Sequence, residues 1–161
     1  MSHLVWTPHL TVATIIERDG RFLLVEEYAD GDDLVYNQPA GHLDEHETLA
    51  AAAIRETLEE TAWEVQVDAI VGIYYWTHPK GHSFIRTCFA GTALHHHPNQ
   101  GLDQGIQRAL WLTREEIAAL GPKLRSPMVL RCIDDYLAGK RYPLELFSYL
   151  QNAATPPDRL P

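Results

Sequence analysis

The sequence lacks the features that mark several large classes of protein. Its only two cysteines, Cys88 and Cys132, fit no metal-binding or redox spacing, which argues against a disulfide framework or a zinc site and favours a reduced compartment. No hydrophobic run approaches the roughly 20 residues that a membrane helix needs. Residues 1–9 have neither a basic start nor an apolar core. We therefore expect no signal peptide, no membrane partner and a cytoplasmic location.

Basic residues are also scarce. The chain has 13 Lys and Arg against 22 Asp and Glu, a net charge of −9, which disfavours duplex nucleic acid as a partner because such binding depends on clustered Lys and Arg. An acidic protein can still bind phosphates if a metal supplies positive charge.

We expect one domain over 1–150 and a loose tail over 151–161, which holds three prolines. Monomer and homodimer both remain open.

The residue pattern predicts the element order β-β-β-α-β-β-β-α-α, an α/β domain with a mixed sheet covered by helices. Asp19-Gly20 is a strong hairpin signal between the first two strands, and Thr48 is a good N-cap for the first helix. The expected strands are Leu10–Ile16, Arg21–Glu27, Leu34–Gln38, one or two within Glu64–Thr77, His82–Leu94 and Gln107–Leu112. The expected helices run from Thr48 to about Ala62, from the capping box Thr113–Glu116 to before Gly121, and from an N-cap at Ser126 to about Ala138. Residues 41–47 and 95–104 are expected to be loops.

The first helix carries three closely spaced acids. Glu56, Glu59 and Glu60 stand three and four residues apart, so they share one helix face and repel one another. A hard cation such as Mg²⁺ prefers carboxylate oxygens and would relieve that repulsion. We expect these acids to look into a cleft, and the core side of the helix to be the apolar stripe Ala51, Ile54, Leu58 and Ala62. For the three acids alone, a solvated surface helix remains an alternative.

Six positions around this helix carry a resemblance to a known family. Gly41, Glu47, Arg55-Glu56 and Glu59-Glu60 follow the spacing of the Nudix hydrolase signature. The resemblance implies a Nudix-type α/β/α sandwich with a mixed β-sheet, and Mg²⁺-dependent hydrolysis of phosphoanhydride bonds, with Mn²⁺ as a second candidate ion. Four further stretches resemble one bacterial phosphatase of the family: residues 8–13, 37–43, 124–127 and 141–145. That likeness implies nucleoside tri- and diphosphates and the thiamine-pathway hydroxymethylpyrimidine diphosphate as substrates.

The acids can be given provisional roles. We expect Glu56 and Glu60 to be the main metal ligands and Glu59 to be a further ligand or to share a second metal, and the resemblance adds the backbone carbonyl of Ala40. Arg55 is expected to point partly away from the acid face and to pair with Glu47, which orients the loop. Glu56 or Glu59 is the expected general base. Asp103 is the only carboxylate between His95 and Trp111, and an ordinary loop role is expected for it.

Substrate recognition needs aromatic faces and amide groups near the acids. The candidates are Tyr36, Asn37, Gln38, Tyr74 and Trp76, with Arg86 as a phosphate contact. For each aromatic residue a plain core or surface role is the alternative, and for Arg86 a solvated one. His95-His96-His97 is expected to be a solvated turn rather than a metal site.

The chain departs from the family pattern at three positions. The family usually has Gly at the position of Ala62, and aliphatic residues at those of Thr57 and Trp63. A left-handed helix end would cost Ala62 about 1 kcal/mol, and continuation of the helix past it is the alternative.

Two further functional hypotheses stand beside hydrolysis. One is a catalytically silent Nudix-fold module that binds nucleotides or regulates. The other is a structural domain with an acidic helix, which leaves the spacing from Gly41 to Glu60 unexplained.

Overall fold

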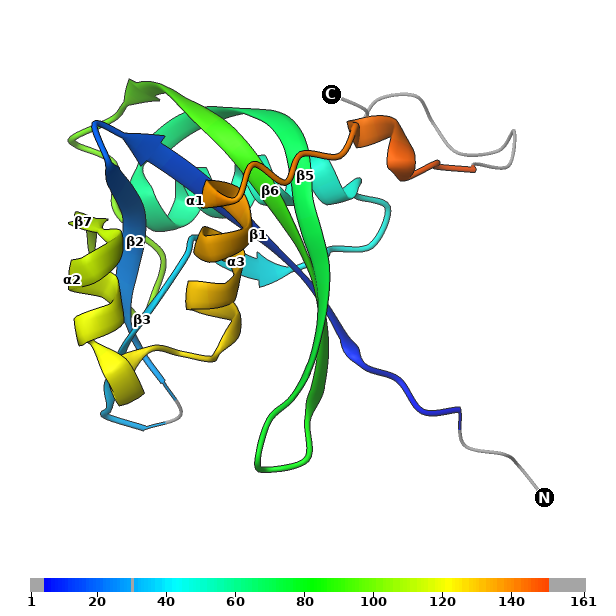
Figure 1. Cartoon of the computed structure of the whole chain (residues 1–161), viewed down its shortest axis with the longest axis horizontal. Helices are drawn as coiled ribbons and strands as arrows, with labels where there is room; N and C mark the ends of the chain where they lie inside the picture. Colours follow the sequence, from blue (N-terminus) through cyan, green and yellow to red (C-terminus); the bar gives the residue numbers. More distant parts are fainter. Residues whose placement is uncertain (1–4, 30, 151–161) are drawn as a thin grey trace.

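The computed structural model describes residues 5–29 and 31–150, so the expected tail at 151–161 lies outside the described part. Its elements follow the expected order with one added strand (Figure 1). In chain order they are β1 (His9–Arg18), β2 (Arg21–Tyr28), β3 (Leu34–Asn37), β4 (Ala40–His42), α1 (Leu49–Thr61), β5 (Trp63–Thr77), β6 (Ser83–His96), β7 (Ile106–Thr113), α2 (Arg114–Ala119) and α3 (Met128–Leu137), with 3-10 turns at Gly121–Lys123 and Leu144–Leu146. None of the helices in these two ranges is long and apolar enough to cross a membrane.

The sheet divides at β1. Its strand order is β3-β2-β1-β6-β5, with β4 paired to β1 and β7 paired to β2. The pairing of β1 with β6 is parallel and the other strand pairs are antiparallel, so the sheet is mixed. Only the end of β1, Glu17 and Arg18, pairs with β2, whereas His9–Ile16 pairs with β6. The two halves of the sheet therefore diverge, and β4 lies in the opening between them.

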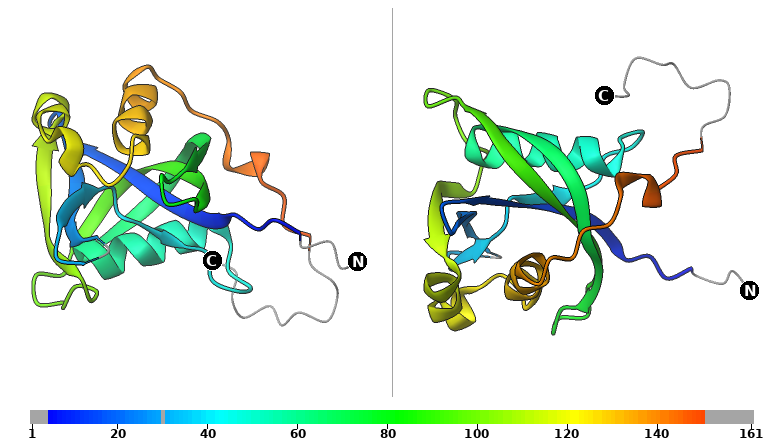
Figure 2. Two further views of the ribbon diagram at one scale, coloured as in Figure 1. Left: turned by 90° about the horizontal axis from the view of Figure 1, so that it is seen from below. Right: turned by 45° about the horizontal axis from the view of Figure 1, so that its top comes forward.

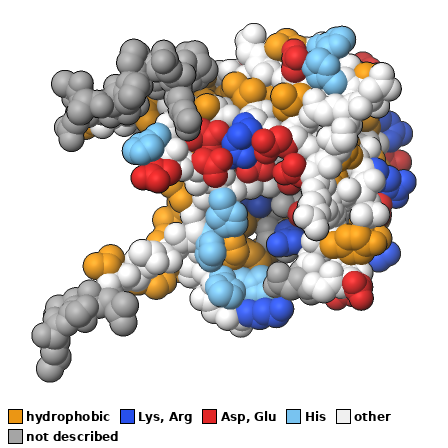
Figure 3. Space-filling view, turned by 180° about the vertical axis from the view of Figure 1, so that it is seen from behind, with side chains coloured by type: hydrophobic (Ala, Val, Ile, Leu, Met, Phe, Trp, Pro, Cys, Tyr) orange, Lys and Arg blue, Asp and Glu red, His pale blue; other side chains and the backbone are white. Residues whose placement is uncertain are grey.

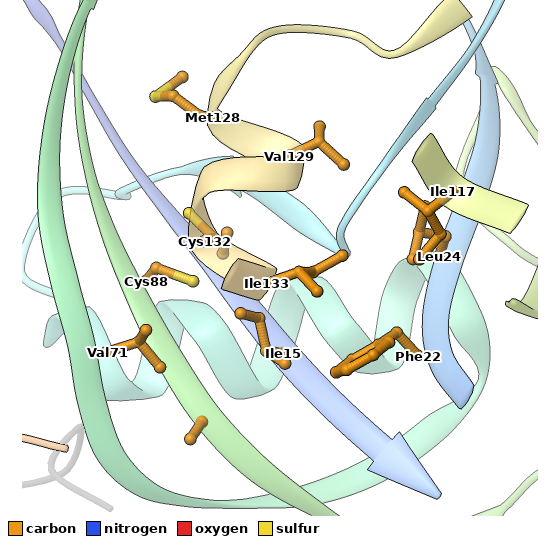
Figure 4. Packing of buried hydrophobic residues seen from close by; sticks show 12 residues of the cluster. Ile15, Phe22, Leu24, Val71, Cys88, Ile117, Met128, Val129, Cys132 and Ile133 are labelled. Atoms are coloured by element: carbon orange, nitrogen blue, oxygen red, sulfur yellow. The ribbon is translucent and has the colours of Figure 1, made fainter. Parts of the chain in front are cut away.

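Helices cover both faces of this sheet, which confirms the expected α/β/α sandwich (Figure 2). One core lies under α2 and α3 and is built from residues that include Ile15, Leu24, Cys88, Ile117 and Ile133 (Figure 4). A second core lies between the sheet and α1, where the buried residues are Val12, Leu49, Ala52, Ala53, Ile70 and Phe89. Helix α1, which carries the acids of the predicted metal site, thus lies on the side of the sheet opposite α2 and α3.

Local turn and cap signals are mostly confirmed. Asp19 and Gly20 both have positive φ, 53° and 74°, as a two-residue hairpin turn requires. Thr113 and Glu116 form the complete capping box at the start of α2. The expected N-cap at Ser126 is wrong, because α3 begins at Met128 after Pro127 and the Ser126 hydroxyl makes no hydrogen bond.

Two expected loops are partly strand. Residues 40–42 form β4 because they pair with Thr11–Ala13 of β1, a contact that no local pattern reveals. Strand β6 extends to His96, so His95 and His96 belong to the sheet and not to a turn. His96 packs on Trp63 with ring centroids 4.7 Å apart, and His97 Nε2 lies 2.7 Å from Glu64 Oε1.

Candidate active site

Helix α1 begins and ends with defined caps. The Thr48 hydroxyl accepts a hydrogen bond from the Ala51 N–H at 3.1 Å, as expected. Ala62 adopts the left-handed conformation with φ 58°, and its N–H donates to the Leu58 carbonyl at 2.9 Å. The alternative that the helix continues past Ala62 is therefore wrong. An alanine pays a conformational penalty of about 1 kcal/mol at a position that suits glycine.

The buried side of α1 differs from the expected apolar stripe. Ala51, Ile54 and Leu58 are only partly buried, while the sheet side consists of Leu49, Ala52, Ala53, Thr57, Glu60 and Thr61. Thr57 is accommodated there because its hydroxyl donates to the Ala53 carbonyl at 2.7 Å and lies 3.1 Å from the Thr14 hydroxyl. The acids are consequently next to the covered face of the helix, which disagrees with the solvated-helix alternative.

Glu60 is a buried carboxylate with little compensation. It is 7% exposed and accepts one hydrogen bond, from the Ala40 N–H at 2.9 Å. No Lys, Arg or His of the described chain forms an ion pair with it. Burial raises the pKa of Glu60 to about 9, and the charges of Glu27, Glu56 and Asp103 act in the same direction.

Glu56 lies directly against the backbone of β4. A Cβ placed on Gly41 would be 2.1 Å from both Cδ and Oε1 of Glu56, so only glycine leaves room for this carboxylate. Burial raises the pKa of Glu56, and the neighbouring Arg55 partly offsets that effect. The expected close approach of the chain at Gly41 is confirmed. The Ala40 group that touches an acid is its N–H, and a ligand role for the Ala40 carbonyl remains a prediction.

Arg55 joins the acids to the loop before the helix. Its Nε and Nη2 donate to the two carboxylate oxygens of Glu47 at 2.8 and 3.0 Å, which confirms the expected pairing and lowers the pKa of Glu47. Nη2 also donates to the His42 carbonyl at 3.1 Å. The expectation that Arg55 points partly away from the acids is wrong, since Nη1 donates to Glu56 at 2.9 Å and to Glu59 at 3.1 Å.

These groups form one acidic surface around a single basic side chain, beside a hollow rimmed by histidines (Figure 3). Across residues 5–29 and 31–150, no three His, Cys, Asp or Glu side chains are already arranged to hold an ion. Arg55 occupies the space between Glu56 and Glu59. The donor set nevertheless fits a divalent cation, because Glu60 is buried without a cation and carboxylate oxygens are the ligands that Mg²⁺ and Mn²⁺ take.

Sequence analysis did not single out Glu27 and predicted an ordinary loop role for Asp103, and both residues lie near the acids of α1. The Asn37 amide donates to Glu27 at 3.2 Å, and the charge of Glu27 contributes to the raised pKa of Glu60. The Asp103 N–H donates to the Glu59 carbonyl at 3.0 Å, and its charge raises the pKa of Glu56 and Glu60. No local signal separated Glu27 from Glu26, whereas Asp103 was recognisable as the one carboxylate of its loop.

Three of the predicted substrate-binding residues meet. Arg86 Nη1 donates to the side-chain oxygens of Asn37 and Gln38, both at 3.3 Å. Gln38 in turn donates to the Val129 carbonyl of α3 at 2.7 Å. Arg86 is 5% exposed, so the solvated alternative for it is wrong.

The three aromatic candidates lie elsewhere. The Tyr36 hydroxyl donates to Glu26, its partner across β2 and β3, on the opposite side of β3 from Asn37. The Tyr74 hydroxyl donates to Asp135 at 3.0 Å and lines a separate cavity of about 350 Å³ with Arg131 and Tyr142. Trp76 stacks on Phe84 with ring centroids 5.7 Å apart. Their core and surface alternatives therefore fit the structure better than contact with the acids.

Comparison with known proteins agrees with this geometry. The family model described as the NUDIX domain matches residues 7–132. The chain belongs to the Nudix hydrolase family. Phosphatase NudJ of Escherichia coli K12 is 41% identical over 142 residues, which cover 88% of this chain and 92% of NudJ. This Nudix hydrolase therefore matches NudJ over nearly the full length of both proteins.

Solved structures show the same fold. A Nudix hydrolase from Nitrosomonas europaea superposes with a TM-score of 0.87 and 43% identity, covering 89% of this chain and 98% of that one. A bifunctional NMN adenylyltransferase/ADP-ribose pyrophosphatase from Francisella tularensis, solved with AMP and a manganese ion, has a TM-score of 0.62. At 18% identity, covering 84% of this chain and 43% of that one, it shares the fold alone with this Nudix hydrolase.

Proposed function

We propose that this Nudix hydrolase cleaves phosphoanhydride bonds of nucleoside tri- and diphosphates at the acidic surface of α1, with Mg²⁺ as cofactor and Mn²⁺ as a substitute. The observation that carries the proposal is the buried, uncompensated carboxylate of Glu60 beside Glu56 and Gly41. Glu56, Glu59, Glu60 and the Ala40 carbonyl are the proposed ligands. A divalent ion bound there would neutralise phosphate oxygens and make a water molecule more acidic.

The surrounding residues have supporting roles in this proposal. Glu47 holds Arg55, and Arg55 in turn holds the His42 carbonyl, so this pair fixes β4 against the start of α1. Glu56 and Glu59 are the candidates for the general base. The raised pKa of Glu56 favours it as an acceptor of a proton from water near neutral pH.

The similarity to Phosphatase NudJ supports phosphate release. Removal of the terminal phosphate, and action on the thiamine-pathway hydroxymethylpyrimidine diphosphate as a second substrate class, are further parts of the proposal. The partner is thus a small diphosphate or triphosphate in the cytoplasm rather than duplex nucleic acid. The second candidate is a silent nucleotide-binding module. It accounts less well for the acids, because a protein that only binds nucleotides does not need Glu56, Glu59 and Glu60 together.

Phosphate release from a panel of nucleotides in the presence of Mg²⁺ tests the proposal. Glu56→Gln and Glu60→Gln are each expected to lower kcat by about 100-fold or more, since each removes a charge that would hold the ion. Glu115→Gln, an exposed glutamate of α2, is the matched control and should match the wild type.

Equal turnover by all variants would show that the proposed ligands are wrong. If the wild type binds nucleotides but hydrolyses none of the panel, the silent module is the better description. Measuring orthophosphate against pyrophosphate among the products identifies the bond that is cleaved.

A further inference from the structure

Three buried side-chain atoms in the described part of the chain have no hydrogen-bond partner: Thr11 Oγ1, Arg86 Nε and Ser126 Oγ. Buried polar groups are nearly always paired, because an unpaired one has lost its water without replacement. Two of the three are neighbours. Thr11 of β1 is the register partner of Arg86 of β6, so their side chains leave the sheet on the same face.

The charge of Arg86 is also uncompensated. Both of its hydrogen bonds come from Nη1 and go to neutral amide oxygens, those of Asn37 and Gln38. Within residues 5–29 and 31–150 no Asp or Glu oxygen lies within 4.0 Å of its guanidinium nitrogens, whereas even the largely exposed Arg108 has Glu26 at 2.8 Å. A buried arginine without a counter-charge is strongly unfavourable unless a ligand supplies one.

The free part of the guanidinium is the edge formed by Nε and Nη2. Two parallel N–H groups on one edge match the paired oxygens of a phosphate or a carboxylate. Asn37 connects the guanidinium to Glu27, because its amide oxygen accepts from Arg86 Nη1 at 3.3 Å and its amide nitrogen donates to Glu27 at 3.2 Å. The hollow next to the acids has Lys or Arg atoms at its floor (Figure 3).

We propose that the Nε–Nη2 edge of Arg86, together with the Thr11 hydroxyl, binds a second anionic group of the substrate, a phosphate beyond the one held at α1. This inference rests on the proposed function and assigns to it the residues that hold the second phosphate.

Arg86→Met, Arg86→Lys and Thr11→Val test this subsite, with Arg114→Met as the control because Arg114 forms an exposed pair with Asp134 on the helices α2 and α3. Two measurements are made: calorimetric binding of inorganic pyrophosphate to chelator-treated protein, and kcat and KM for nucleoside diphosphates with Mg²⁺. Arg86→Met should weaken pyrophosphate binding and raise KM at least 10-fold, with kcat within about 3-fold. For Arg86→Lys, pyrophosphate affinity and KM should lie between those of the wild type and Arg86→Met, because lysine keeps the charge but lacks the two parallel N–H groups of the guanidinium.

Thermal unfolding separates this role from a structural one. The midpoint of Arg86→Met should stay close to that of the control, because the variant removes a buried charge without a counter-ion but also takes the donor from the amide oxygens of Asn37 and Gln38. A midpoint well below that of the control, with unchanged pyrophosphate affinity, would overturn the proposal. If Arg86→Met does not fold, unchanged KM and pyrophosphate affinity in both Arg86→Lys and Thr11→Val would overturn it as well.

The outcomes also distinguish this inference from the proposed function. Loss of pyrophosphate binding in Arg86→Met would support the subsite even if the wild type released no phosphate from any nucleotide. Normal hydrolysis with a KM that is independent of Arg86 would refute the subsite alone.

Discussion

Replacing Gly41 by alanine should separate catalysis from stability in this protein. Gly41 has an ordinary φ, so the backbone accepts alanine without strain. The new Cβ would lie 2.1 Å from Cδ and Oε1 and 2.3 Å from Oε2 of Glu56. Non-bonded carbon and oxygen atoms need more than about 3 Å, so the Glu56 carboxylate has to move by about 1 Å or more.

The displaced atoms are the end of a flexible side chain, which makes the movement inexpensive for folding. We expect the free energy of unfolding to change by no more than about 1 kcal/mol. A misplacement of about 1 Å in a catalytic group lowers rates by about 100-fold, so kcat should fall by about that factor.

Gly101→Ala is the matched control, because its Cβ would meet nothing within 4 Å and its φ is also ordinary. Urea unfolding gives the stability of both variants, and phosphate release from a nucleoside diphosphate with Mg²⁺ gives kcat. If Gly41→Ala stays within 3-fold of the control in kcat, the position of the Glu56 carboxylate does not matter for turnover. The reasoning that connects Gly41 to the chemistry would then be refuted.

Three further changes have defined outcomes. In metal-free protein, Glu60 stays protonated in the folded state up to a pKa of about 9 but ionises near 4.5 when unfolded, so wild-type stability falls as pH rises between these values. From about pH 5 to 8 in urea unfolding, the free energy of unfolding of Glu60→Gln should therefore rise relative to that of the wild type by about 1.4 kcal/mol per pH unit. A difference between the two proteins that does not change with pH would contradict the raised pKa. Ala62→Gly should raise stability by about 0.5–1 kcal/mol by relieving the left-handed φ, and a lowered thermal midpoint would count against it. Glu47→Gln should lose about 1–2 kcal/mol of unfolding free energy and lower kcat, because Arg55 loses the charged partner that accepts two of its hydrogen bonds, whereas the exposed control Glu45→Gln should change neither quantity.

Short-range signals predicted much of the fold. The Asp19-Gly20 turn, the Thr48 N-cap and the Thr113–Glu116 capping box depend on residues within four positions of one another, and all three are confirmed. Strand β4 was missed because its three residues form a strand only through pairing with β1. The buried side of α1 was misjudged because the sheet packs against Leu49, small residues and Thr57, whereas Ile54 and Leu58 are only partly buried.

In the candidate site too, contacts within one segment could be predicted and contacts between distant segments could not. The spacing from Gly41 to Glu60 was enough to expect the acids to gather and Arg55 to pair with Glu47. The approach of Glu27 and the burial of Arg86 depend on β2 and β6, which the sheet brings together from distant parts of the chain. The aromatic candidates were chosen by nearness to predicted strands, and alternation along those strands turns Tyr36 away from Asn37.

The hydroxyl contact between Thr57 and Thr14 has a consequence for how accurately the acids are aimed. Apolar contacts between a helix and a sheet are non-directional and tolerate small rotations of the helix about its axis. A hydroxyl pair has a preferred angle and resists such rolling. Thr57 is one position from Glu56 and three from Glu60 in the same helix. The buried contact therefore restrains rotation of α1 about its axis, and with it the direction in which both carboxylates point.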